Sequence, residues 1–351
     1  MRETGTPRMN CTSRVAIACA LGGLALANAE TTAPPAASSA PAATARARHP
    51  ERSVGDWLLR MHEASRVRSY VGTFVVLSNS GSMSSARIWH ACEGDQQVER
   101  VESLTGPPRS VFRRNEEVVT FLPETRTVRT EKRESLGMFP NLLKASESSI
   151  PQFYAALPLG NDRVAGFETD VVQLAPRDNL RFGYRIWSEK KSGLVIKLQT
   201  VSAQGTVLEQ VAFSELQLDA PVRADKLNQM MLATEGWRVE KPDAAKTSAD
   251  AEGWQLRSPV AGFKPVSCYK RPGAGGVAPA GTMQWIFSDG LAAVSLFVEA
   301  YDRQRHVREG LFASGATQTL TRRIQDWWLT AVGEVPQQTL DAFANSLERR
   351  K

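Results

Sequence analysis

The sequence is poor in the side chains from which catalytic and metal sites are built. It has only four histidines and four cysteines among 351 residues. No Gly-x-Ser-x-Gly motif nominates a nucleophilic serine, and the glycine-rich run 273–281 lacks the Lys and Ser/Thr that end a phosphate-binding loop. A structural zinc site usually needs four ligands, and only His90 and Cys92, with Glu93 nearby, are close enough to share a site. We therefore expect no catalytic residues, no metal and no cofactor, and the protein is predicted not to be an enzyme.

The chain also lacks an apolar stretch long enough to cross a bilayer. Its longest apolar run, from Val15 to Ala27, has 13 residues, against the roughly 20 that a spanning helix needs. Three arginines at positions 2, 8 and 14 precede this run, and small residues follow it at positions 27 to 29. This is the three-part form of a secretory signal peptide. We predict a signal peptide over residues 1–29, cleavage after Ala29, and a mature protein exported to the periplasm.

The charge of the mature chain is small. The whole sequence has a formal charge of +6, and residues 1–29 contain three arginines and one glutamate, so +4 remains after cleavage. Such a small excess of positive charge does not favour nucleic acid as a partner. The 322 residues left after removing 29 from 351 suit two domains, each able to bury its own core.

Two cysteines, Cys92 and Cys268, stay in the mature chain, and we place them in different domains. In an oxidising compartment they could form a disulfide. Two separate thiols are an equally good interpretation of the same residues.

The hydrophobic pattern divides the chain into segments. Residues 30–50, rich in Ala, Pro, Ser and Thr, are predicted to be a disordered leader. Apolar residues at helical spacing then predict a helix over residues 52–67. The first domain, residues 51–222, otherwise has the alternating pattern of an antiparallel sheet of roughly ten strands. We expect these strands at residues 70–77, 85–90, 97–104, 110–114, 117–122, 125–131, 163–175, 181–189, 194–202 and 206–218.

An apolar segment over residues 136–159 interrupts the strands, and we expect one or two short helices or an apolar loop there. A polar stretch over residues 223–252, with a short helical pattern at its start, is predicted to link the domains. The second domain, residues 253–351, has strand patterns at 283–287, 292–301, 316–322 and 327–332, and a helix from Pro336 onward.

Two groups of side chains in the first domain could contact a lipid. Met138, Phe139, Leu142 and Leu143 could line an apolar cavity or simply fill a core. Basic residues at 126, 129, 132 and 133, among them Arg126 and Arg129, could offer positive charge to lipid phosphates or form a solvated sheet face. The sequence leaves both pairs of interpretations open.

Several runs spread over both domains resemble the RseB/MucB family of sigma-E (AlgU-type) regulators. No single run is decisive, but their order and spacing cover nearly the whole mature chain. They lie at residues 163–166, 176–187 and 193–197 in the first domain and at residues 253–254, 262–263, 287–299 and 333–336 in the second. This sequence departs from the usual pattern in its two mature cysteines and its long polar linker.

The resemblance implies an α+β fold. It implies a large N-terminal domain similar to the lipoprotein carriers LolA and LolB, an unclosed antiparallel half-barrel with helices over its concave face, and a smaller C-terminal α+β domain. It also implies a periplasmic regulator that binds the periplasmic region of an RseA/MucA-like anti-sigma factor, protects it from proteolysis, and releases it when lipopolysaccharide or lipoprotein lipid binds. A homo-oligomer is compatible with all of this.

The alternative function is a periplasmic lipid or lipoprotein carrier of the LolA type, which should work with the first domain alone. The regulator should also need the second domain. There, Arg303, Arg305 and Arg308 are the candidate contacts for an acidic segment of the partner. Asp289 and Gly290 suit a tight turn, and Tyr184 and Trp187 suit packing on a sheet face, so we expect these residues to hold the fold.

Overall fold

The computed structural model describes residues 52–94, 96–115, 117–132, 139, 149–241, 244–271 and 281–350. The predicted signal peptide and leader lie outside these residues. In the described part of the chain, no helix is both long enough and apolar enough to cross a membrane.

Helix α1 (Val54–Val67) opens the first domain, within two residues of the prediction. Ser53 caps it: the Ser53 hydroxyl accepts from the backbone N–H of Asp56, and the Asp56 carboxylate accepts from the backbone N–H of Ser53. This reciprocal capping box satisfies N–H groups that a helix start leaves free. The apolar stripe of the helix, including Trp57, Leu58 and Met61, is buried.

The first domain is built on one twelve-stranded, mostly antiparallel sheet, which is the unclosed sheet that we expected. Its strand order is β12-β6-β5-β4-β3-β2-β1-β11-β10-β9-β8-β7, so β7 and β12 are the two edges. The strands in chain order are β1 (Tyr70–Ser78), β2 (Met83–Glu93), β3 (Gln96–Ser103), β4 (Ser110–Arg114), β5 (Glu117–Leu122), β6 (Thr127–Lys132), β7 (Tyr154–Val164), β8 (Phe167–Pro176), β9 (Gly183–Glu189), β10 (Val195–Val201) and β11 (Val207–Leu218). A 3-10 turn, η1 (Pro123–Thr125), lies between β5 and β6.

One stretch of the first domain differs from the expected pattern. Residues 163–175, predicted as one strand, contain the turn between β7 and β8, where Ala165 and Gly166 both have positive φ. In the described part of the apolar segment before it, residues 139 and 149–159, the helix is the four-residue α2 (Ile150–Phe153), because the chain enters β7 already at Tyr154. Proline and small residues in this segment concealed the alternation of a strand.

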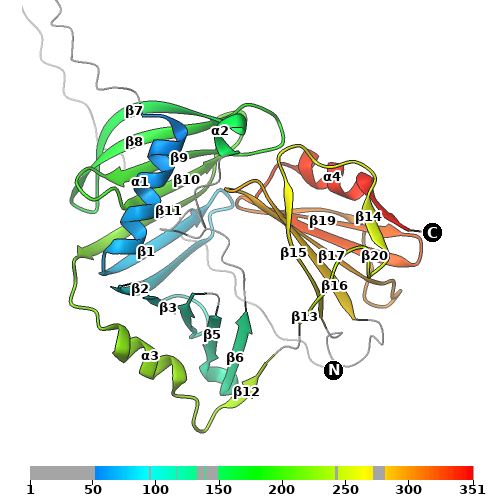
Figure 1. Cartoon of the computed structure of the whole chain (residues 1–351), viewed down its shortest axis with the longest axis horizontal. Coiled ribbons are helices and arrows are strands. Elements are labelled where there is room, and N and C mark those ends of the chain that lie inside the picture. The colour runs from blue at the N-terminus through cyan, green and yellow to red at the C-terminus, as the bar shows by residue number, and fades with distance from the viewer. Residues whose placement is uncertain are drawn as a thin grey trace, which may run out of the picture. The chain divides into compact units, whose positions relative to one another are not determined.

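Helices cover both faces of the first sheet, as Figure 1 shows. On one face, α1 packs on β8, β9 and β10 through a cluster that includes Leu174, Ile186 and Val195. On the opposite face, α3 (Ala224–Leu232) packs through Leu227 on Ala91 and Val98 and through Met231 on the apolar residues of β4, β5 and β6. The strands alternate between these faces, so each helix meets its own set of side chains.

The segment predicted as a linker has more structure than its polar composition indicated. It contains α3, then β12 (Arg238–Glu240), which pairs in parallel with β6 of the first sheet. Next comes β13 (Ala245–Lys246), which pairs with β15 of the second sheet. The predicted domain boundaries stay a prediction, and the chain crosses from one sheet to the other between β12 and β13.

The second domain has a seven-stranded antiparallel sheet in the order β13-β15-β16-β17-β20-β19-β18. Helix α4 (Gln337–Ser346) packs on it, and the short strands β14 (Trp254–Leu256) and β21 (Leu347–Arg349) form a separate pair. The sheet strands are β15 (Lys264–Arg271), β16 (Thr282–Ser288), β17 (Ala293–Ala300), β18 (Gly310–Ser314), β19 (Thr317–Ile324) and β20 (Trp327–Gly333). The predicted strands and final helix are confirmed, and the sequence pattern missed β15, β18 and the short strands β13, β14 and β21.

Candidate functional site

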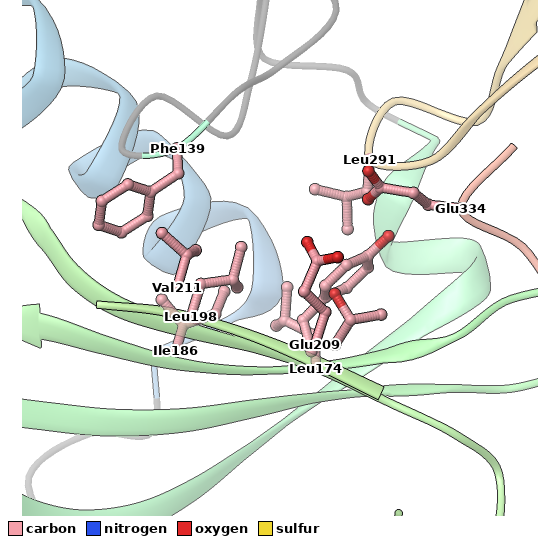
Figure 2. A pocket seen from close by; sticks show the side chains of 10 residues that line it. Phe139, Leu174, Ile186, Leu198, Glu209, Val211, Leu291 and Glu334 are labelled. Atoms are coloured by element: carbon pink, nitrogen blue, oxygen red, sulfur yellow. The ribbon is translucent and has the colours of Figure 1, made fainter. Parts of the chain in front are cut away.

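A cavity lies on the α1 face of the first sheet (Figure 2). Strands β8 to β11 supply most of its wall, because residues two apart on a strand point to the same face. Leu291 and Glu334, from turns of the second domain, complete it. The lining residues are Phe139, Leu174, Tyr184, Ile186, Leu198, Thr200, Glu209, Val211, Leu291 and Glu334.

The two ends of this cavity differ in polarity. Phe139, Ile186, Leu198 and Val211 gather at one end, and Glu209 points away from them toward the side where Glu334 lies. The volume is about 190 Å³, below the roughly 300–1,000 Å³ of most ligand pockets. As it stands, the cavity has room for the end of an apolar chain but not for a whole lipid.

The end of the cavity that holds Glu209 and Glu334 favours the neutral form of both carboxyl groups. Burial raises the pKa of Glu209, although a hydrogen bond from the backbone of Ala316 opposes the shift. Partial removal from water also raises the pKa of Glu334, and the negative charge of Glu209 adds to the effect, even though part of the Glu334 side chain stays exposed. Carboxyl groups offer no positive charge to a phosphate, so the cavity favours an acyl chain over a lipid headgroup.

The described residues that the sequence suggested for lipid contact lie in different parts of the first domain. Phe139 lines the cavity and packs against Phe74 and Phe213. Met138, Leu142 and Leu143 lie outside the described residues. Arg126 and Arg129 lie at β6, at the far end of the sheet from β8 to β11, and Arg129 forms an ion pair with Glu240 at 3.4 Å. The basic residues therefore do not flank the cavity.

A buried ion pair joins the first domain to the second. Arg181, 1% exposed, donates through Nε to Asp289 Oδ2 at 2.7 Å and through a terminal nitrogen to the carbonyl oxygen of Ala261 at 2.6 Å. It also forms an ion pair with Asp178. Every polar group near the guanidinium is thus used, which is the condition for a buried charge to be tolerated.

The surroundings of Arg181 require particular residues in the second domain. Gly262 has φ +81°, and a Cβ atom placed there would come within 2.0 Å of the Arg181 guanidinium. Asp289 forms the tight turn that we expected, since its Oδ1 accepts from the N–H groups of Leu291 and Ala292. Its other oxygen holds Arg181. The sequence showed the turn but not the ion pair, because its two charges lie 108 residues apart.

The three candidate arginines of the second domain differ in their surroundings. Arg305 forms ion pairs with Glu299 and Asp302, both at 3.2 Å. Arg303 and Arg308 are exposed. Close to Arg308 runs β18, the edge strand of the sheet, where Leu311 and Phe312 are 37% and 49% exposed. An edge strand presents unpaired backbone groups to which an extended peptide can add.

The two mature cysteines lie in different sheets. Cys92, on β2, is partly exposed, and Cys268, on β15, is buried; both are free thiols in the structure. A disulfide between them stays a prediction. Glu93, which the sequence placed beside His90 and Cys92, is exposed instead, and its carboxylate accepts from the backbone N–H of Ala224 at 3.3 Å. Among the described residues, no group of three or more His, Cys, Asp or Glu side chains could hold a metal ion.

Both domains match models of one protein family, in the expected order. Residues 53–231 match the MucB/RseB N-terminal domain, and residues 248–348 match the MucB/RseB C-terminal domain. The chain belongs to the MucB/RseB family. This confirms the resemblance seen in the sequence.

Characterised members of the family resemble the chain over most of its length. It is 30% identical over 300 residues to the sigma factor AlgU regulatory protein MucB of Pseudomonas aeruginosa, covering 83% of this chain and 90% of that protein. It is 22% identical over 297 residues to the sigma-E factor regulatory protein RseB of Escherichia coli K12, covering 84% and 90%. These relatives are regulatory proteins, and on that ground the MucB/RseB family member described here is not an enzyme.

Solved structures of MucB share the fold. A complex of Pseudomonas aeruginosa MucA and MucB superposes with a TM-score of 0.66 at 27% identity, covering 85% of this chain and 99% of that one. A crystal structure of MucB in complex with MucA(peri) gives a TM-score of 0.64 at 27% identity, covering 84% and 98%. The MucB/RseB fold therefore extends over both sheets of this protein.

Proposed function

We propose that this protein is a periplasmic regulator that binds the periplasmic region of a MucA/RseA-like anti-sigma factor and protects it from proteolysis. The observation that carries the proposal is the match of both domains, in order, to the MucB/RseB family, together with the likeness to MucB chains that are in complex with MucA. Residues 1–29, cleaved after Ala29, would direct export. A carrier of the LolA type would not need the second domain, so its match favours the regulator.

The surface that best fits such a partner is the edge of the second sheet. Arg303 and Arg308 supply positive charge, and Leu311 and Phe312 supply exposed apolar surface along β18. An acidic segment with alternating apolar residues would pair with the free edge of β18 and place its charges near the arginines. Arg305 contributes less, because its charge is already balanced by Glu299 and Asp302.

Binding of a MucA-type periplasmic domain to the mature chain, residues 30–351, tests this proposal. We expect reversal of two charges, Arg303→Glu with Arg308→Glu, to weaken the complex about tenfold or more at low salt, and less at high salt, where charge interactions are screened. The matched control is Arg109→Glu, an exposed arginine in a loop of the first domain. No binding by the unaltered chain would overturn the proposed function. Equal loss in the control and in the double variant would overturn the assignment of the surface.

We further propose that an acyl chain of lipopolysaccharide or of a lipoprotein enters the cavity and releases the partner. The apolar end formed by Phe139, Ile186, Leu198 and Val211 supports this. The cavity would have to widen, and its wall includes Leu291 and Glu334 of the second domain, so widening would disturb the contacts between the domains.

Release of a labelled MucA-type domain by purified lipopolysaccharide tests the lipid step. Leu198→Trp would fill the apolar end and should raise the lipopolysaccharide concentration needed for release severalfold. Leu232→Trp is the control, since Leu232 is 63% exposed at the end of α3. Release that is unchanged in Leu198→Trp would count against the cavity as the lipid site while leaving partner binding intact.

A further inference from the structure

Three ionisable side chains line up on the α1 face of β2 and β3. His90 and Cys92 are two residues apart on β2, so they share a face, and His90 Nε2 lies 2.9 Å from Cys92 Sγ. Glu99 stands directly opposite His90 in the register of β2 and β3. Its Oε1 lies 3.0 Å from His90 Nδ1. The imidazole therefore bridges a thiol and a carboxylate.

The cluster holds the imidazole in place and favours its charged form. His90 is 2% exposed and stacks on Tyr70 of β1, with ring centroids 4.7 Å apart. Burial alone would lower the pKa of His90, but its hydrogen bonds to Cys92 and Glu99 and their negative charges outweigh burial and raise it to about 9. Glu99 stays ionised beside this charge and lies 3.4 Å from Arg113 of β4.

The arrangement does not suit metal binding. A metal ion would need His90, Cys92 and Glu99 to converge on one point, whereas here each ring nitrogen of His90 already faces a different partner. A purely structural hydrogen-bond network would suit the buried members of the cluster. Cys92, however, is partly exposed at the end of β2. A partly exposed thiol beside a fixed imidazolium is the arrangement that generates a nucleophilic thiolate.

We propose that Cys92 is a modification site at which small organic disulfides of the oxidising compartment form a mixed disulfide with the protein. In this step the Cys92 proton is held by His90, and the thiolate attacks one sulfur of the disulfide R–S–S–R. A new S–S bond joins Cys92 Sγ to one R–S group, the S–S bond of the reagent breaks, and the other half leaves as R–S⁻ and takes up a proton from solvent. Cys92 is oxidised and the leaving thiol is reduced, so the exchange needs no other reactant.

Modification would disturb the end of α1. In the structure, Cys92 Sγ lies 3.6 Å from the carbonyl oxygen of Arg68, the residue that ends α1. The backbone N–H of Cys92 donates to the Ser69 hydroxyl at 3.1 Å. A bulky group on the Cys92 sulfur would break the contact between this sulfur and the Arg68 carbonyl oxygen. The site is separate from the cavity and from β18, and of the proposed function it rests only on export to an oxidising compartment.

The reaction of the mature chain with oxidised glutathione tests the proposal, with the adduct at each cysteine measured by peptide mass spectrometry. At pH 6.5 we expect folded Cys92 to react at least tenfold faster than the same cysteine in urea, where an ordinary thiol is almost fully protonated. Cys268 of the same molecule is an internal control. Burial raises the pKa of its thiol to about 11, so it should stay unmodified until the chain unfolds. Folded Cys92 reacting more slowly than in urea at every pH would overturn the proposal.

Two variants test the role of His90 as a positioning residue. His90→Gln keeps a polar side chain but carries no charge, and it should slow modification tenfold or more at pH 6.5 but little at pH 9.5. Glu99→Gln keeps a hydrogen-bond acceptor for His90 and removes the charge that stabilises the imidazolium, so it should shift the rate profile toward higher pH. The groups that face the pair are Tyr70 from β1, Glu99 from β3, Arg113 from β4 and, at the end of α1, Arg68 with its partner Asp219.

Circular dichroism confirms that each variant is folded before its rate is used. Should His90→Gln fail to fold, the pH profile of the unaltered chain and of Glu99→Gln decides the question. A profile for folded Cys92 that matches the profile in urea would show an ordinary thiol and would overturn the proposal.

Discussion

The two sheets of this protein organise their apolar side chains differently. In the second domain, one continuous cluster runs from Trp254 to Leu347 and joins the seven-stranded sheet to α4. In the described part of the first domain, the buried apolar residues fall into four separate clusters, two on each face of the sheet. The larger domain is thus the one with the divided core.

The two domains also differ in buried polar atoms that have no hydrogen-bond partner. Among the described residues, the second domain has Ser267 Oγ, and the first has Trp57 Nε1, Arg60 Nη1, Tyr70 Oη, Arg100 Nε, Arg185 Nε and Ser188 Oγ. Such groups reduce stability. The cavity and the His90 cluster lie in this domain as well. The second domain thus has one continuous apolar core, while the first has a divided core with internal space and ionisable groups on its α1 face.

The ion pair between the domains gives the largest expected effect. Arg181→Met removes the guanidinium and leaves Asp289 buried without its partner, so the free energy of unfolding should fall by roughly 3–5 kcal/mol. Urea unfolding followed by tryptophan fluorescence measures this change. The matched control is Arg223→Met, which breaks the exposed Arg223–Asp225 pair and should leave stability unchanged. Equal effects in both variants would show that the junction does not support either domain.

Truncation of one leucine in each domain tests the comparison directly. Leu296 is fully buried at the centre of the continuous cluster, and Leu296→Ala should cost roughly 3 kcal/mol, because the rigid surroundings cannot close the new cavity. Leu198 is only partly buried, so Leu198→Ala removes less buried apolar surface and should cost about 2 kcal/mol or less. Denaturant unfolding of both variants provides the measurement. A larger loss for Leu198 would contradict the view that the first core is the looser one.

The charge of His90 makes stability depend on pH in the first domain. Its pKa is raised from 6.5 to about 9 in the folded chain, so the folded state holds a proton that the unfolded state has lost between these values. This contribution, roughly 3 kcal/mol, is complete below pH 6.5 and disappears as the pH rises to 9. Urea unfolding at pH 6, 7.5 and 9 should show the decline, and His90→Gln should flatten it. Cys268, with its pKa at about 11, affects stability only at higher pH.

The cap of α1 gives the smallest expected effect. Ser53→Ala removes the acceptor for the Asp56 N–H and should lower stability by about 1 kcal/mol. Ser84→Ala, an exposed serine of β2, is the control. Hydrogen exchange should localise the change to the amides at the start of α1. Protection lost throughout the second domain would mean that the two cores are coupled more tightly than their separate clusters indicate.

Most of the secondary structure could be predicted from the sequence, because the signals for helices and strands come from residues that are close together in the chain. The helix at α1 and the strands β4 and β5 follow directly from apolar spacing and turn residues. The same rules missed β7, where prolines and glycines hide the alternation, and β15, which opens with Lys264 and Pro265. Phe139, one of the candidate residues from the sequence, lines the cavity. The same rules could not supply Glu209 or Glu334, whose polar side chains look like those of any exposed strand or turn.

The sequence by itself identified the family and predicted the signal peptide and the division into two domains, because each prediction depends on residue types close together in the chain or on the order of motifs along it. Tertiary structure alone decided which distant residues meet. Arg181 finds Asp289, Glu209 approaches Glu334, and His90 is held between Cys92 and Glu99. These contacts depend on strand register and on the packing of one domain against the other, and no local pattern in the sequence encodes either.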